Sequence, residues 1–167
     1  MRVLILASIL LGLSGCADTD PSSMPRPREP SATDRGYYCG MSLAEHSGPR
    51  GQIFLEGHPE PLWFSSIQDA LFYRFTEGET LRTQAFYVND MGNTDWDRPQ
   101  SGAWVEAGLA LYVVDSRRGG GMGAREYVPF SRRETAEAFV RDYGGVIVSF
   151  EELPRSMIAS SPPDPGI

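Results

Sequence analysis

Cysteine is scarce in this sequence, which holds Cys16 and Cys39 among 167 residues. Histidine is equally scarce, and His46 and His58 are well separated, whereas a zinc site needs about four Cys, His or acidic ligands. Basic clusters are few and the net charge is −7, which argues against nucleic acid as a partner, because its binding depends on Lys and Arg. The glycine-rich segment Gly119–Gly123 lacks the Lys and Ser/Thr of a phosphate-binding loop. These absences disfavour zinc, nucleic-acid and nucleotide-phosphate sites.

Apolar runs of membrane-spanning length are absent after residue 16. The chain opens with Met1-Arg2 and a short apolar run, Val3–Leu13, which is typical of a signal peptide and is shorter than the ~20 residues of a transmembrane helix. The run leads into Leu13-Ser14-Gly15-Cys16, the pattern of a bacterial lipobox. We therefore expect residues 1–15 to be removed and Cys16 to carry the lipid that anchors the protein, each acyl methylene contributing ~0.8 kcal/mol. An ordinary signal peptide with Cys16 near the cleavage point is the alternative.

The expected location is the bacterial cell envelope, as a periplasm-facing lipoprotein. Ala17, not an aspartate, follows the lipidated cysteine directly, which favours the outer membrane. Lipidation of Cys16 leaves Cys39 without an intramolecular partner, so Cys39 is a free reactive thiol or a ligand. A buried cysteine that acts as a small hydrophobic residue is the alternative.

The composition divides the chain into four parts after the signal peptide. Residues 16–36 are rich in Pro, Ser and charge and are expected to form a flexible tether behind the lipid. Residues 37–100 are expected to form a first lobe with a connector, and residues 101–154 a second lobe. Residues 155–167 are expected to be a disordered tail.

An internal repeat supports the two lobes. Leu62–Tyr73 resembles Val128–Phe139 with an offset of 66 residues. Each segment contains a Ser-x-x-Gln/Glu capping box, starting at Ser65 and at Ser131, and so predicts a helix start. Gly144-Gly145 is expected to end the second helix.

Strand-like runs surround both predicted helices. They are Gln52–Leu55, Pro61–Phe64 and Ala85–Val88 in the first half, and Trp104-Val105, Ala110–Val114, Glu126–Phe130 and Val146–Phe150 in the second. The predicted fold is α+β, with two similar ββαβ lobes whose antiparallel sheets each carry one helix.

The triplet Cys39-Gly40-Met41 is the strongest candidate for chemistry. A thiolate and a thioether are soft donors that select Cu(I), and side chains two residues apart share a face if the backbone is extended. Met122, in the glycine-rich segment, and His46 could add a third ligand. The alternatives are an incidental methionine at a mobile hairpin tip and a solvated loop histidine.

Two other functional classes remain open on these residues. Cys39 paired with His46 or His58 could form a nucleophile for a thiol-dependent hydrolase or lyase. A metal-free scaffold lipoprotein would need none of these side chains.

A set of short motifs between Tyr37 and Phe150 resembles the NosL family, copper-binding lipoproteins that are accessory to nitrous oxide reductase. The motifs are Cys39-Gly40-Met41, Gly48-Pro49, Gln52-Ile53, Phe64-Ser65, Asp69, Tyr87-Val88, Asp90-Met91-Gly92, Asp95-Trp96, Met122-Gly123, Val128-Pro129-Phe130 and Gly144-Gly145.

The resemblance implies a Cu(I) chaperone without turnover of its own. It would supply the copper–sulfide centre of nitrous oxide reductase together with an ABC-type maturation complex. Position by position, it implies that Cys39 and Met41 are copper ligands, with Met122 as the third from the second half and His46 as a substitute or an addition. It also implies two ββαβ lobes similar to a domain of alkylmercury lyase, whose chemistry needs a cysteine pair that this chain lacks.

Overall fold

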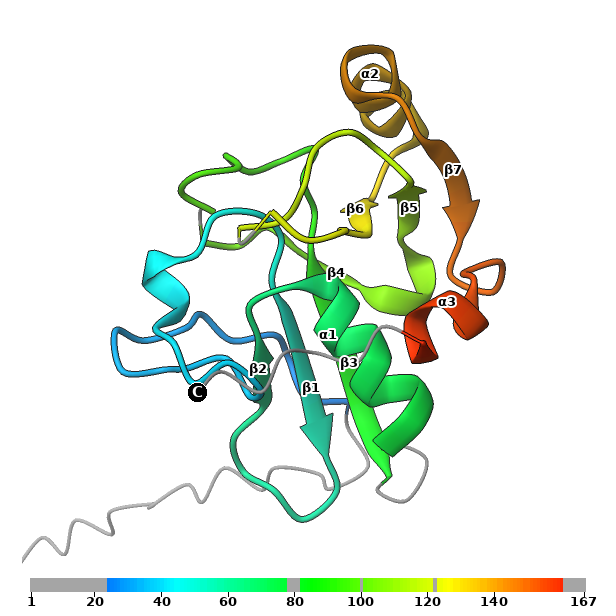
Figure 1. Cartoon of the computed structure of the whole chain (residues 1–167). Coiled ribbons are helices and arrows are strands. Elements are labelled where there is room, and N and C mark those ends of the chain that lie inside the picture. Colours follow the sequence, from blue (N-terminus) through cyan, green and yellow to red (C-terminus); the bar gives the residue numbers. More distant parts are fainter. Residues whose placement is uncertain (1–23, 78–81, 100, 122, 161–167) are drawn as a thin grey trace, which may run out of the picture.

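A computed structural model describes residues 24–77, 82–99, 101–121 and 123–160 (Figure 1). The expected signal peptide, the lipidated Cys16 and the side chain of Met122 lie outside the described residues. Within the described ranges, no helix has the length and apolar character needed to cross a membrane.

The first half forms a four-stranded antiparallel sheet in the order β2-β1-β3-β4. Its strands are β1 (Gly51–Leu55), β2 (Leu62–Phe64), β3 (Thr83–Asn89) and β4 (Trp104–Glu106). β4 falls in the range expected for the second lobe, yet it pairs with β3 and so extends the first sheet.

The second half forms a three-stranded antiparallel sheet in the order β6-β5-β7. Its strands are β5 (Leu111–Val114), β6 (Val128–Phe130) and β7 (Val146–Ser149). The order corresponds to β2-β1-β3, and the register agrees, because Gly51 pairs with Phe64 as Leu111 pairs with Phe130. The predicted α+β class with two similar antiparallel lobes is confirmed.

The first helix, α1 (Ile67–Phe72), begins one residue later than its predicted capping box requires. Ser66 is the N-cap, and its hydroxyl oxygen accepts a hydrogen bond from the Asp69 amide at 3.1 Å. The capping box at Ser65 is therefore wrong. The reason is tertiary, since the Ser65 hydroxyl lies against the Cys39 thiol instead.

The second helix, α2 (Arg133–Tyr143), shows the same one-residue displacement. Arg132 occupies the N-cap position without a side-chain capping bond, so the capping box at Ser131 is also wrong. The Ser131 hydroxyl donates instead to the Asp90 carboxylate of the first half. The predicted helix stop is confirmed: Gly144 follows the last helical residue with a φ of 72°.

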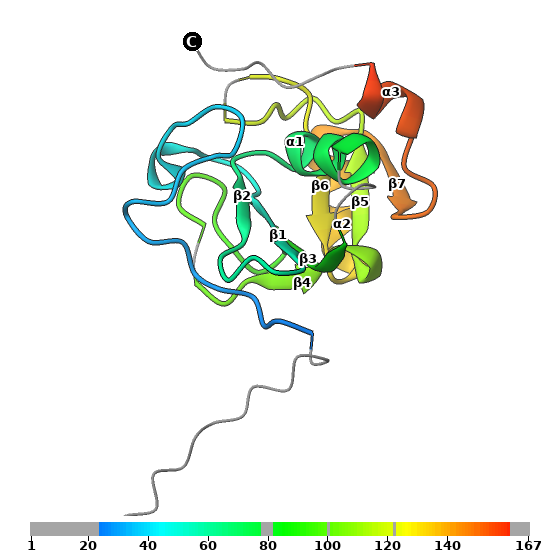
Figure 2. The ribbon, with the colours of Figure 1, turned by 90° about the horizontal axis from the view of Figure 1, so that it is seen from below.

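The largest hydrophobic core is shared by the two halves. Its fully buried members include Ile53, Phe64, Ile67 and Leu71 from the first half, and Tyr112, Tyr127 and Ile158 from the second. Along β5 the side chains alternate, so that Tyr112 and Val114 face this core while Val113 joins a smaller core with Phe130 beneath α2. Figure 2 shows the two sheets side by side, β1–β4 in the first and β5–β7 in the second.

The expected tether is only partly a free spacer. From Met24 onward it lies along the outer face of the first sheet. Gln52 of β1 exchanges two hydrogen bonds with the backbone of Arg28, at 2.9 and 3.0 Å, and the Tyr87 hydroxyl donates to the Pro25 carbonyl oxygen at 2.7 Å. The polar composition suggested a solvated chain, but its backbone satisfies polar groups of the sheet. We refer to residues 24–34 as the N-terminal arm.

The expected disordered tail is also shorter than predicted. Residues 155–159 form a short helix, α3 (Arg155–Ala159), which packs against α1. Ile158 is fully buried in the shared core, and Leu153 just before the helix is buried as well. Leu153 and Ile158 thus attach this segment to the shared core, although the sequence around them lacks hydrophobic periodicity.

Candidate metal-binding site

A closed loop presents Cys39. Arg35 and Ser42 form an isolated antiparallel bridge at its base. Inside the loop, the Gly36 amide donates to the Met41 carbonyl oxygen at 3.0 Å, and the Gly40 amide donates to the Gly36 carbonyl oxygen at 2.8 Å. We call residues 35–42 the Cys39 loop. Its backbone bonds hold the loop in shape without any contribution from the thiol.

The Cys39 thiol is buried, with 8% of the residue exposed. Its Sγ lies 3.3 Å from the Ser65 hydroxyl oxygen. A Cβ added to Gly36 would lie 2.5 Å from the same sulfur, so only glycine fits there. The Tyr37 amide donates to the Trp63 carbonyl oxygen at 2.7 Å and fixes the loop to β2. The thiol therefore occupies a preformed position at the end of this strand.

Met41 differs from Cys39 in exposure, because 40% of it is accessible to solvent. The extended backbone that would place the Cys39 and Met41 side chains on one face is not present. Residues 37–39 form a turn, and Gly40 has a φ of +64°, a left-handed conformation that favours glycine. The loop thus combines a buried thiol with a thioether at the surface.

His46 is brought back to the Cys39 loop by a 3₁₀ turn, η1 (Leu43–Glu45). The residue is 7% exposed, and its Nδ1 lies 3.0 Å from the Ser42 carbonyl oxygen. Because a carbonyl oxygen only accepts, Nδ1 carries the proton of this bond. The lone pair of Nε2 is then available to a metal ion.

Asp69, in the first turn of α1, interacts electrostatically with His46. Burial raises the pKa of the Asp69 carboxyl, while its bond to Ser66 and the attraction of His46 act in the opposite direction. The bond from Nδ1 to a backbone carbonyl is the kind of contact that fixes the ring orientation of histidine in metal sites.

Gly121, in the glycine-rich part of the second half, meets the first half at Ser47. A Cβ on Gly121 would lie 2.6 Å from the Ser47 carbonyl oxygen, and one on Gly48 would lie 3.7 Å from the Gly121 amide nitrogen. The structure therefore brings the residue before Met122 against the residue after His46.

The second histidine lies elsewhere. His58 is exposed in the turn that joins β1 to β2, at the far end of β1 from His46. In the part of the chain that the structure describes, no three His, Cys, Asp or Glu residues are grouped closely enough to hold a metal ion.

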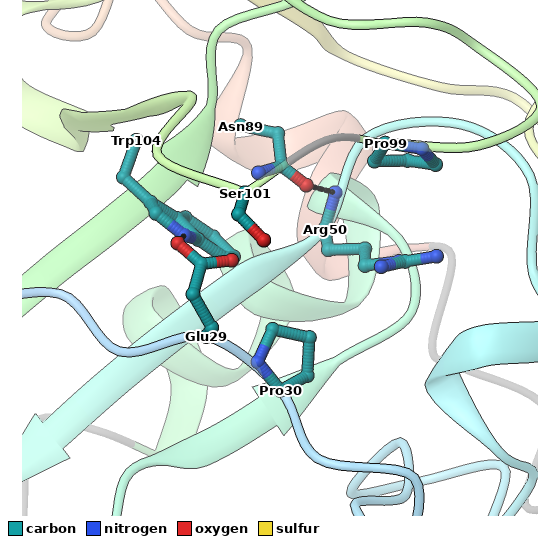
Figure 3. Close-up of a pocket in the computed structure, with 7 residues that line it drawn as sticks. All are labelled: Glu29, Pro30, Arg50, Asn89, Pro99, Ser101 and Trp104. Carbon is teal, nitrogen blue, oxygen red and sulfur yellow. Dashed lines mark hydrogen bonds between the residues drawn. The ribbon is translucent and has the colours of Figure 1, made fainter.

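A polar pocket of about 120 Å³ is lined by residues that include Glu29, Arg50 and Trp104 (Figure 3). Burial lowers the pKa of its Arg50 guanidinium, and the negative charge of Glu29 acts against that shift. Arg50 Nη2 donates to the His46 carbonyl oxygen at 3.1 Å, and the Glu29 carboxylate accepts from the Trp104 indole nitrogen at 3.0 Å. The pocket therefore lies between Glu29 of the N-terminal arm and Arg50, whose side chain is bonded to the backbone of His46.

These features define an α+β protein of two related lobes, with a buried thiol and an exposed thioether in one loop and an imidazole bonded to the end of that loop. The chain belongs to the NosL family, whose model matches residues 27–158.

Relatives and solved structures agree with this assignment. The copper-binding lipoprotein NosL of Achromobacter cycloclastes is 43% identical over 95% of this chain and 82% of its own length. The protein of the same name from Stutzerimonas stutzeri is 28% identical over 93% and 80%. The crystal structure of the copper chaperone NosL from Shewanella denitrificans matches with a TM-score of 0.73 at 28% identity, covering 78% of this chain and 97% of that one. The solution structure of apo-NosL from A. cycloclastes matches with a TM-score of 0.50 at 45% identity, covering 65% and 87%.

Proposed function

We propose that this protein is a membrane-anchored Cu(I) chaperone that delivers copper for the copper–sulfide centre of nitrous oxide reductase. The observation that carries the proposal is a buried thiol and an exposed thioether in one closed loop, with the Nδ1 of His46 bonded to the Ser42 carbonyl oxygen of the same loop. Soft sulfur donors favour Cu(I) over Cu(II) and over hard cations. The relatives from A. cycloclastes and S. stutzeri are copper-binding lipoproteins, which points to the same cargo.

Three side chains are the proposed ligands of the copper ion. Cys39 supplies a thiolate and Met41 a thioether, and Met122 supplies a second thioether from the other half. His46 Nε2 is the competing or additional donor, since its Nδ1 is held by the Ser42 carbonyl. Copper then joins the two halves.

The exposure of the site fits delivery better than storage. Met41 is 40% exposed, so the donors of a recipient protein can approach the ion while Cys39 still holds it. Transfer then proceeds by exchange of one ligand at a time. The proposed recipient is nitrous oxide reductase, reached together with its ABC-type maturation complex.

The thiol-enzyme alternative has less support. A nucleophilic cysteine needs a base within hydrogen-bond reach. The neighbour of Cys39 Sγ is the Ser65 hydroxyl at 3.3 Å, and His46 directs its Nδ1 proton at a backbone carbonyl. The protein is therefore proposed to bind and transfer without turnover. A metal-free scaffold would not need the Cys39 thiol, the Met41 thioether or the His46 imidazole.

The ligand assignment is tested by anaerobic titration of the mature protein with Cu(I) against a chromophoric Cu(I) chelator. One ion is expected to bind per chain. Met41→Leu and Met122→Leu keep side-chain size but remove a sulfur, so each is expected to weaken binding without unfolding the protein. Affinity unchanged in Met122→Leu but lowered in His46→Ala would show that His46, and not Met122, is the third ligand.

The lipid anchor is tested by Cys16→Ser. Removal of the acylated thiol is expected to leave the precursor uncut or to release the protein from the outer-membrane fraction. Cell fractionation and gel mobility are the measurements, with Cys39→Ser as the control that keeps the anchor. A Cys16→Ser protein that fractionates and migrates like the parent would rule out lipidation.

A further inference from the structure

Two large hydrophobic side chains are exposed at one edge of the molecule. Leu109, the last residue of a 3₁₀ turn after β4, η3 (Ala107–Leu109), is 74% exposed, and Met24, at the start of the N-terminal arm, is 52% exposed. A cavity of about 230 Å³ is lined both by Met24 and by Gly108, the residue before Leu109. The two exposed side chains therefore border one surface. We call Met24, Leu109 and this cavity the Leu109 face.

The cavity lies where one edge of β3 is not covered by a neighbouring strand. Within the described residues, β4 pairs with Tyr87–Asn89 of β3 and not with the part of β3 that precedes them. That part, residues 83–86, lines the cavity together with Phe150, whose ring lies 6.3 Å from the ring of Phe86. An uncovered strand edge beside exposed apolar side chains is a surface that proteins usually cover. The Leu109 face is therefore a candidate contact surface.

The start of the arm is the described part of the chain closest in sequence to the expected lipid. Met24 follows Cys16 by eight residues, and a chain of that length spans at most about 28 Å. The arm is fixed at this edge because the Tyr87 hydroxyl donates to the Pro25 carbonyl oxygen. In Figure 2 the blue start of the arm lies at the edge of the molecule beside β3 and β4. A lipid on Cys16 therefore keeps the Leu109 face near the bilayer.

The charges around this face suit phospholipid headgroups. Arg74 and Glu106 line the cavity, and Arg26 is exposed two residues after Met24. Within the described residues, neither Arg26 nor Arg74 forms an ion pair. Two guanidinium groups thus stand against one carboxylate in a protein whose net charge is −7. Arginine attracts headgroup phosphates, while leucine and methionine enter the interface between water and acyl chains.

We propose that the Leu109 face is a membrane-contact surface that rests on the phospholipid bilayer. The inference rests on the proposed lipid anchor at Cys16. The acyl chains hold the protein at the bilayer, and the side chains of Met24 and Leu109 enter its interface. Because the anchor alone leaves the folded part free to rotate, the second contact sets the orientation of the protein.

This orientation turns the copper loop away from the bilayer. β1 begins at Gly51, which pairs with Phe64, the residue before the serine that contacts the Cys39 thiol. The strand ends at Leu55, which pairs with Thr83 in the lining of the cavity. The thiol and the cavity therefore lie toward opposite ends of β1. A protein that rests on its Leu109 face presents the Cys39 loop to recipient proteins and not to lipid.

Hydrogen–deuterium exchange tests this orientation. The mature lipidated protein on vesicles of phosphatidylethanolamine and phosphatidylglycerol is compared with the mature Cys16→Ser chain in buffer, which carries no lipid. Amides of residues 107–110 are expected to exchange about 10-fold more slowly on the vesicles, because lipid covers them. Amides of the Cys39 loop are expected to exchange at the same rate in both samples.

Leu109→Asp is the variant, and Val146→Asp is its matched control. Val146 is 60% exposed on β7, in the other sheet. Lipidated Leu109→Asp is expected to stay on the vesicles through its acyl chains but to lose the protection of residues 107–110, whereas Val146→Asp should retain it. Both variants are expected to bind Cu(I) with the parent's affinity, because neither residue is near the thiol.

The outcomes separate this inference from the anchor on which it rests. Mass spectrometry that finds no acyl chain on Cys16 would refute the anchor itself. An acylated parent whose residues 107–110 exchange equally on vesicles and in buffer would overturn only the Leu109 face, as would protection that persists in Leu109→Asp. Protection that rises with protein concentration in buffer without vesicles would assign the face to a second copy of the chain and would also overturn the inference.

Discussion

Replacing Cys39 by serine is expected to abolish tight Cu(I) binding. With Cys16 lipidated, Cys39 is the only thiolate donor left in the sequence. The hydroxyl oxygen of serine is a hard donor with little affinity for a soft monovalent ion. We expect affinity to fall by more than about a thousandfold, which corresponds to about 4 kcal/mol. The fold should remain, because the Cys39 loop is closed by backbone hydrogen bonds and serine is smaller than cysteine.

Competition with a Cu(I) chelator under anaerobic conditions measures this loss, and urea unfolding confirms that stability is retained. Ser65→Ala is the matched control, since it removes the hydroxyl 3.3 Å from the sulfur but keeps the thiolate. Binding in the parent should weaken as pH falls, because the thiol must lose its proton to bind copper. Undiminished copper binding in Cys39→Ser would refute the whole site.

Local patterns in the sequence predicted most of the fold. The two Phe-Ser motifs predicted that strands end at Phe64 and Phe130, as β2 and β6 do. The strand-like runs predicted the bounds of the other strands to within two residues. What these patterns could not predict is which sheet a short strand joins. The residues of β4 do not indicate which sheet it joins. Its pairing with β3 places it in the first sheet.

The capping errors have a physical cause that sequence reasoning alone does not reach. The hydroxyl of a serine before a helix can form a hydrogen bond with a distant residue instead of capping the helix. Ser65 faces the Cys39 thiol and Ser131 binds Asp90, so the helices begin one residue later. Ser66 caps α1 in place of Ser65, and the carboxyl of Glu126, which lies 59 residues from Ile67 along the chain, accepts a further hydrogen bond from the Ile67 amide. No local rule connects groups that distant.

The candidate site was only partly readable from the sequence. Residue type predicted Cys39, Met41, Met122 and His46 as candidate ligands, because thiolate, thioether and imidazole groups can bind Cu(I). The supporting residues Ser65, Glu126 and Arg50 were missed. Glycines gave the available signal: Gly36 and Gly120 stand where a side chain would meet the Cys39 sulfur and the Glu126 carboxyl. A glycine indicates that another group packs closely at that position, but it does not indicate which group.

The second large effect concerns the two equivalent phenylalanines. Phe64→Ala and Phe130→Ala are each expected to lower the free energy of unfolding by about 3–5 kcal/mol, a large fraction of the stability of a single domain. Both side chains are buried, at 1% and 2% exposure, and each ends the edge strand that precedes its helix. Urea unfolding followed by tryptophan fluorescence measures the loss, and Phe→Leu at each position is the control, expected to cost less because it leaves a smaller cavity.

The two changes should differ in their effect on copper. Phe64 belongs to the shared core, and its ring lies 5.8 Å from that of Tyr37 and 6.0 Å from that of Tyr38, both in the Cys39 loop. Phe130 packs on Phe139 of α2, in the smaller core. Phe64→Ala is therefore expected to weaken Cu(I) binding by the fully folded protein, whereas Phe130→Ala should leave it unchanged. Equal copper affinities in the two variants, measured where both remain folded, would show that the ring of Phe64 does not support the Cys39 loop.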